Sequence, residues 1–74
     1  MDDYTAIGLA EGFVEPTGET EEDREREIIN AWQHLIDTGQ CWQLQGWFGR
    51  TAMHLIESGI CHPAKKDDEP DQEN

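Results

Sequence analysis

The chain has 74 residues, of which 17 are acidic and 5 are Lys or Arg, so its formal net charge is -12. A chain this short forms at most one domain with a marginal core, and such scaffolds usually need a metal, disulfides, very good helix packing or a second subunit. Repulsion between like charges argues against direct binding to nucleic acid or to an anionic membrane, so we expect basic or neutral partners.

Residues 1–18 are predicted to form an N-terminal strap. The segment has enough apolar side chains to pack on a core, but Gly8 and Gly12 weaken any regular element in it. We therefore expect a short helical turn or an extended segment across the core. Pro16-Thr17-Gly18 is typical of a turn, and it separates the strap from the first long helix.

A helix is predicted from Glu21 to Thr38. Thr20 is a good N-cap, and acidic residues occupy the first turn after it, where negative charge complements the helix dipole. Gly39 is placed to take the left-handed conformation that closes the helix. The apolar residues recur at three- and four-residue spacing and form one buried stripe: Ile28, Ile29, Trp32, Leu35 and Ile36.

The end of this helix has a second copy twenty positions further along the chain. Leu35–Cys41 matches Leu55–Cys61, and both copies read Leu-Ile-acid-hydroxyl-Gly before a variable residue and a Cys. We interpret the copies as two helix C-termini, closed by Gly39 and Gly59. A solenoid needs at least about three repeats, so that architecture is excluded.

A second helix is predicted over residues 45–58, with a possible start at Gln40. Gly46 and Gly49 each cost about 0.5 to 1 kcal/mol relative to Ala in a helix. We expect a close approach of another backbone there, or a break between a short helix and a longer one. The two helices should form an all-α helical hairpin within a core of residues 19–63.

Residues 64–74 read AKKDDEPDQEN and contain no large apolar side chain. Such a segment cannot offset the entropy lost on ordering, so a disordered acidic tail is predicted.

Catalytic and metal-binding chemistry is not indicated. Cys41 and Cys61 fit no dense disulfide framework and are expected to be reduced and buried. Among the Cys and His residues only Cys61 and His62 are near neighbours, which is poor spacing for zinc. No orienting third group or phosphate-binding loop accompanies them, so we expect no enzyme, no metal and no cofactor.

Two surfaces are candidates for binding. The predicted partner-binding residues are Trp42, Trp47, Phe48 and Arg50, because Trp and Arg are enriched at binding hot spots. The alternative is that the Trp side chains fill the core or a homodimer interface, and that Arg50 pairs with an acidic residue such as Asp37 or Glu57. The predicted acidic surface consists of Glu21, Glu22, Asp23 and Glu25.

Several stretches resemble a family of small, mostly uncharacterised proteins of tailed bacteriophages. They read Ala31-Trp32-Gln33, Leu35-Ile36-Asp37-Thr38-Gly39, Trp42-Gln43-Leu44-Gln45-Gly46-Trp47-Phe48-Gly49-Arg50-Thr51-Ala52 and Leu55-Ile56-Glu57. The resemblance covers about residues 28–62 and implies a phage origin and action in the bacterial cytoplasm. It implies no activity.

The leading hypothesis is therefore a non-enzymatic protein that binds and modulates a host bacterial protein. One alternative is a nucleic-acid mimic that occupies a basic groove of a host enzyme with the acidic flank, and another is a small structural homodimer. No run of about 20 apolar residues occurs, and Met1-Asp2-Asp3 lacks the features of a signal peptide, so we expect a location in the host cytoplasm.

Overall fold

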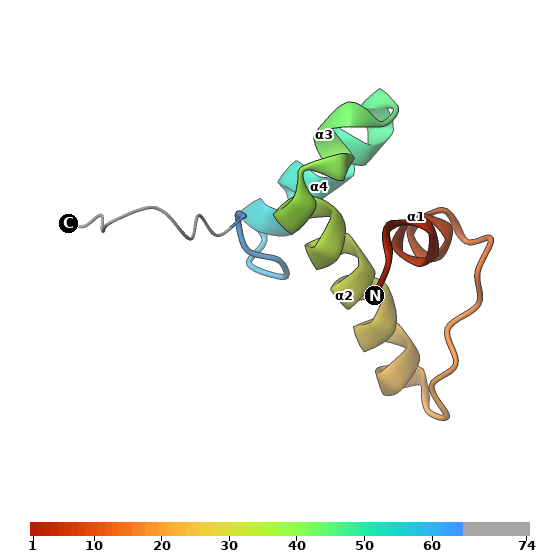
Figure 1. Ribbon diagram of the computed structural model, residues 1–74. Coiled ribbons are helices and arrows are strands. Elements are labelled where there is room, and N and C mark those ends of the chain that lie inside the picture. Colours follow the sequence, from red (N-terminus) through yellow and green to blue (C-terminus); the bar gives the residue numbers. More distant parts are fainter. Residues whose placement is uncertain (65–74) are drawn as a thin grey trace.

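The computed structural model describes residues 1–64 and shows an all-α protein. This part of the chain contains α1 (Asp3–Glu11), α2 (Glu21–Thr38), α3 (Gln40–Gln43) and α4 (Gly46–Glu57), and no strand. The long helix α2 is central, with α1 against one side and with α3 and α4 near its C-terminal end (Figure 1). The predicted all-α class is confirmed, whereas the predicted tail lies, except for Ala64, outside the described residues.

Of the two expectations for the strap, the helical one holds for its first half, where the regular helix α1 is longer than a short turn. Asp2 caps its start by accepting a hydrogen bond from the Thr5 amide at 3.1 Å. Gly12 ends it with a φ of 90°, so this glycine terminates the helix rather than weakening it. Gly8 gives the chain room to return across the helix, since a Cβ there would overlap the side chain of Val14.

Hydrogen bonds hold the segment between α1 and α2 against the first turns of α2. The Glu27 carboxylate accepts from the amide of Thr17 at 3.0 Å and from its hydroxyl at 3.2 Å. The Arg24 guanidinium donates to the carbonyl of Gly18 at 3.0 Å. Sequence patterns did not indicate either contact, because each joins a turn to a helix that starts several residues later.

The boundaries predicted for α2 are confirmed. The Thr20 hydroxyl accepts from the Asp23 amide at 3.1 Å, and Gly39 closes the helix with a φ of 80°. Gly59 has a φ of 85° and comes just after the end of α4, so both glycines are left-handed stops, as predicted.

The two copies of the terminal motif also share their hydrogen bonds. The amides of Gly39 and Gly59 each donate to an isoleucine carbonyl, at Ile36 and Ile56 respectively, over 3.1 Å. One residue earlier, the Thr38 and Ser58 hydroxyls donate to the carbonyls of the corresponding leucines at 3.5 and 3.1 Å. The two ends are similar but not identical, because the first leads directly into α3, whereas in the second the amides of Ile60 and Cys61 also donate to the carbonyl of Leu55.

The second predicted helix corresponds to α4, which runs through Gly49 without interruption. An uninterrupted helix from Gln40 is wrong, because Leu44 takes an extended conformation and separates α3 from α4. Gly49 contributes to the packing of these two helices, since a Cβ there would lie 3.5 Å from Cε3 of Trp42. The prediction of a break between a short helix and a longer one is confirmed.

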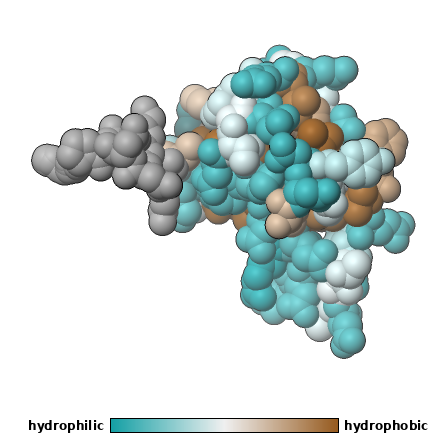
Figure 2. All heavy atoms as spheres, viewed as in Figure 1, coloured by the Kyte–Doolittle hydropathy of each residue, from teal (hydrophilic) through white to brown (hydrophobic). Residues whose placement is uncertain are grey.

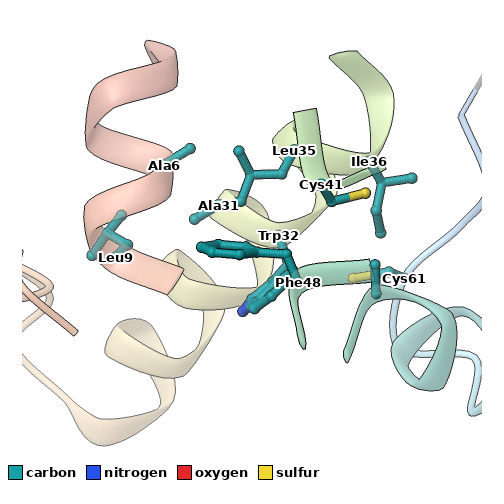
Figure 3. Packing of buried hydrophobic residues seen from close by; sticks show 10 residues of the cluster. Ala6, Leu9, Ala31, Trp32, Leu35, Ile36, Cys41, Phe48 and Cys61 are labelled. Carbon is teal, nitrogen blue, oxygen red and sulfur yellow. The ribbon is translucent and has the colours of Figure 1, made fainter. Parts of the chain in front are cut away.

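One hydrophobic core joins all four helices and the segment after α4. Figure 3 shows Ala6 of α1 and Ala31 of α2 pointing toward one another, with Trp32 above Phe48. The ring centroids of Trp32 and Phe48 are 5.7 Å apart. Complete burial of a side chain such as Phe48 contributes about 1.5 to 3 kcal/mol. The buried residues are Ala6, Leu9, Ala31, Trp32, Leu35, Ile36, Cys41, Phe48, Ala52 and Cys61.

Candidate functional site

The candidate site is the solvent-facing side of α4 together with Trp42, and we call it the α4 surface. Trp42 and Met53 are large apolar side chains that are each 48% exposed, and Trp42 lies against Gly49 of this helix. Gly46 and Arg50 are exposed on the same side of the helix. Met53 was missed from sequence, although it lies four residues after Gly49 and therefore on the same side as that glycine.

Arg50 is exposed and forms no ion pair within residues 1–64. The expected pairing with Asp37 or Glu57 is wrong. Asp37 instead accepts a hydrogen bond from Gln33 at 3.0 Å, and Glu57 lies two helical turns further along α4. Arg50 therefore has its guanidinium free to meet a carboxylate outside residues 1–64.

Trp47 and Phe48 are more buried than Trp42 and Arg50, the two exposed members of the predicted partner-binding set. Phe48 is only 1% exposed, so its assignment to the partner-binding surface is wrong. Trp47 is half-buried and stacks on Phe48 with a centroid distance of 4.0 Å, while Trp32 meets it edge-on at 6.2 Å. Of the predicted partner-binding residues, the structure places Trp42 and Arg50 at the surface and leaves Trp47 half-buried.

The predicted acidic surface lies at the first two turns of α2. Glu21, Glu22 and Glu25 are exposed, and the Asp23 carboxylate is 3.6 Å from the guanidinium of Arg26. Figure 2 shows a hydrophilic lobe over this end of α2 at the bottom of the view. Glu27 does not contribute to this surface, because its carboxylate is occupied by Thr17.

The two thiols are free and almost fully buried, at 1% exposure for Cys41 and 2% for Cys61. Burial raises the pKa of both thiols above the ordinary value, and the charge of Asp37 adds to the rise at Cys61. Both therefore stay protonated at neutral pH, which makes them poor nucleophiles. The expectation that each serves as a buried apolar group is confirmed.

A second feature is a hydrogen-bonded clamp that sequence patterns did not indicate. The Gln33 side chain donates to the carbonyl of His62 at 2.9 Å and accepts from its amide at 2.8 Å. The clamp borders an open pocket of about 290 Å³. The two partners are far apart in the chain, so no local pattern could have found them. The residues that line this pocket are Gln33, Asp37, His62 and Pro63.

A third contact joins three helices. The Asp3 carboxylate lies at the start of α1 and is 2.7 Å from Nε2 of His34, with which it forms a hydrogen bond or an ion pair. It also accepts a hydrogen bond from Nε2 of Gln40 at 3.1 Å. It therefore fastens α1 to α2 and α3 at one point. Across residues 1–64, no group of three or more His, Cys, Asp or Glu side chains is placed to hold a metal ion.

Comparison with known proteins identifies a family. Residues 9–69 match the model of a domain of unknown function, DUF7417, and the chain belongs to that family. No curated protein and no solved structure matches the chain. Among the helices of residues 1–64, none has the length and apolar character needed to cross a bilayer.

Proposed function

We propose that this chain is a non-enzymatic phage-type protein that binds and modulates a host bacterial protein in the host cytoplasm. In this proposal the helices α2 and α4 serve as a helical hairpin that presents the α4 surface. The observation that supports it most is the half-exposed indole of Trp42 on the same surface as the unpaired guanidinium of Arg50.

The energetic reason is that burying an exposed indole against a partner releases water from a large apolar area. A free Arg can add a bidentate hydrogen bond to a carboxylate of the partner. Gly46 and Gly49 lack side chains, so Arg50 and Trp42 lie close to the backbone of α4, which brings both of them onto this helix. Trp and Arg together are the residue types most often found at the centre of such interfaces.

Affinity purification from host lysate tests this proposal. We expect the wild-type chain to recover a host protein that Trp42→Ala and Arg50→Ala fail to recover. Tyr4→Ala is the matched control, because Tyr4 is an 81% exposed aromatic residue on α1, away from the α4 surface. Recovery of the same proteins by all four chains would contradict the proposal.

A second candidate function is a nucleic-acid mimic that inhibits a host DNA- or RNA-binding enzyme. It is favoured by the exposed carboxylates of Glu21, Glu22 and Glu25 at one end of α2. A mimic of this kind should lose affinity steeply as salt rises, and Glu22→Gln with Glu25→Gln should weaken it further. Binding that is insensitive to salt but lost in Trp42→Ala would exclude the mimic and favour the α4 surface.

The small structural homodimer is the third candidate. A dimer is favoured because a chain of this length has only a marginal core, and small scaffolds of this kind are often stabilised by a second subunit. Sedimentation equilibrium tests it directly, since a dimer gives twice the mass of the chain at accessible concentrations. A monomer at all concentrations would exclude it.

A further inference from the structure

The two copies of the helix-end motif differ in how far the rest of the protein buries their side chains. Two pairs of positions that face the common core are alike: Cys41 and Cys61 are 1% and 2% exposed, and Trp32 and Ala52 are 6% and 0% exposed. A third pair differs, since Ile36 is fully buried and Ile56 is only half-buried.

The side of α2 that faces α1 has no equivalent cover in the second copy. Ala31 and Leu35 are fully buried, and His34 is half-buried with its ring bonded to Asp3. Their counterparts are all more exposed, since Thr51 and Leu55 are half-buried and His54 is exposed.

The chemistry of the uncovered side is complementary to a carboxylate. His54 lies in the last turn of α4, where the helix dipole favours a positive charge. Arg50 precedes it by one turn, and neither side chain forms an ion pair within residues 1–64. In the first copy, the carboxylate of Asp3 at the start of α1 meets the equivalent histidine at 2.7 Å.

We infer that Thr51, His54 and Leu55 form the docking site for a short amphipathic helix of the partner that carries a carboxylate in its first turn. This helix takes the place on α4 that α1 takes on α2. Its apolar side covers Leu55 and Thr51, and its carboxylate accepts hydrogen bonds from His54 and Arg50. The inference rests on the proposed function and adds a second contact beside the α4 surface: Trp42 lies against Gly49, on the other side of α4 from Thr51, and Arg50 lies between the two.

The helix α1 itself supplies a probe of the right chemistry. A side-chain-stapled helical peptide with the sequence of residues 2–12 is titrated into the full chain, and amide and side-chain NMR signals are monitored. We expect shifts at Thr51, His54 and Leu55. The peptide with Asp3→Asn should bind about two- to fivefold more weakly, and His54→Ala in the chain should cause a similar loss for the parent peptide.

Matched controls separate docking from general effects of charge. Glu57→Gln changes an exposed charge on α4 without removing a hydrogen-bond donor, so it should not weaken binding of the peptide. Shifts confined to residues 31–36 would mean that the peptide displaces α1, and an absence of shifts at millimolar peptide would mean that the site is absent. Either result would overturn the inference.

Three further outcomes separate the inference from the proposed function. A dimer that dissociates in His54→Ala would assign this side of α4 to a second copy and overturn the partner helix. Recovery of a host protein that depends on Trp42, together with no response to the peptide, would defeat the inference and leave the proposed function standing. Peptide binding at His54 with no Trp42-dependent host protein would defeat the proposed function alone.

Discussion

Gly8 and Gly49 both lie inside helices, but their surroundings differ. The position of a Cβ on Gly8 is already filled by the side chain of Val14, whose own Cβ would be 3.1 Å away. At Gly49 the nearest atom is Cε3 of Trp42 at 3.5 Å, an ordinary van der Waals distance. The same substitution should therefore have opposite effects at the two sites.

We expect Gly8→Ala to destabilise the protein by about 1 to 3 kcal/mol, because the added methyl group forces Val14 away from α1. Gly49→Ala should stabilise it by about 0.5 to 1 kcal/mol through the higher helix propensity of Ala. Urea unfolding monitored by far-UV circular dichroism measures both values. Equal effects of the two substitutions would show that Val14 does not pack on Gly8 in solution.

The buried thiols predict a pH dependence with a definite sign. In the unfolded chain Cys41 and Cys61 ionise near pH 9, whereas in the folded protein burial raises their pKa and keeps them protonated. Their contribution to stability is therefore complete below pH 9 and decreases as the pH rises above it.

Urea midpoints measured at intervals from neutral pH to above pH 9 test this expectation. The variant with Cys41→Ala and Cys61→Ala is the control, and its midpoint should decrease less over the same alkaline range. Rapid labelling of native thiols by iodoacetamide at neutral pH would contradict the burial on which the prediction depends.

At the scale of the elements, α2 was predictable because its signals are local. Thr20, the acidic first turn and Gly39 act on their own helix, and the structure uses each of them as expected. The helix α1 was not predictable in the same way, because its glycines look like breakers. Gly12 is a stop, and the role of Gly8 depends on the later return of Val14.

The candidate site shows the same division. Residue type alone was enough to select Trp42 and Arg50, which are exposed. It could not separate them from Phe48. An aromatic ring on α4 is buried when it lies on the side of the helix that faces α2, and residue type alone does not show which side that is. Met53 and the clamp at Gln33 depend on tertiary packing, so they were missed.

The clamp predicts how the segment after α4 is held. Gln33→Ala removes both hydrogen bonds to His62, each of which contributes about 1 kcal/mol. We expect the His62 amide to exchange with solvent at least roughly fivefold faster, as measured by NMR-detected hydrogen exchange. Asn30→Ala, an exposed substitution on the same helix, should leave the exchange of this amide unchanged. An unchanged rate in Gln33→Ala would show that the clamp is open in solution.

For the whole molecule, the main feature is the separation of charge from core. The exposed acids are concentrated at the start of α2, away from the aromatic contacts between α2 and α4. With a net charge of -12, the folded protein brings like charges together, and their repulsion opposes folding. Among residues 1–64, the ion pairs that offset this repulsion are those of Asp23 with Arg26 and of Asp3 with His34.

Salt should therefore stabilise the protein. We expect the thermal midpoint to rise as sodium chloride is increased to about 0.5 M, because the Debye length then falls to only a few ångströms. Glu57→Gln removes a negative charge from the last turn of α4, where the helix dipole disfavours it, so it should raise the midpoint at low salt and reduce the dependence on salt. A midpoint that falls as salt is added would show that attractive pairs outweigh the repulsion.

Because contacts form mainly between helices that are neighbours in the sequence, the fold has a consequence for how fast the chain folds. Each helix packs on the next one along the sequence, α1 on α2, α2 on α3 and α3 on α4. Proteins whose contacts are mostly local in sequence have a low contact order and fold in microseconds to milliseconds. The hydrogen bonds that span most of the sequence, from Gln40 Nε2 to Asp3 and from Cys61 Sγ to the carbonyl of Ile29, close the longest loops, so they should form last.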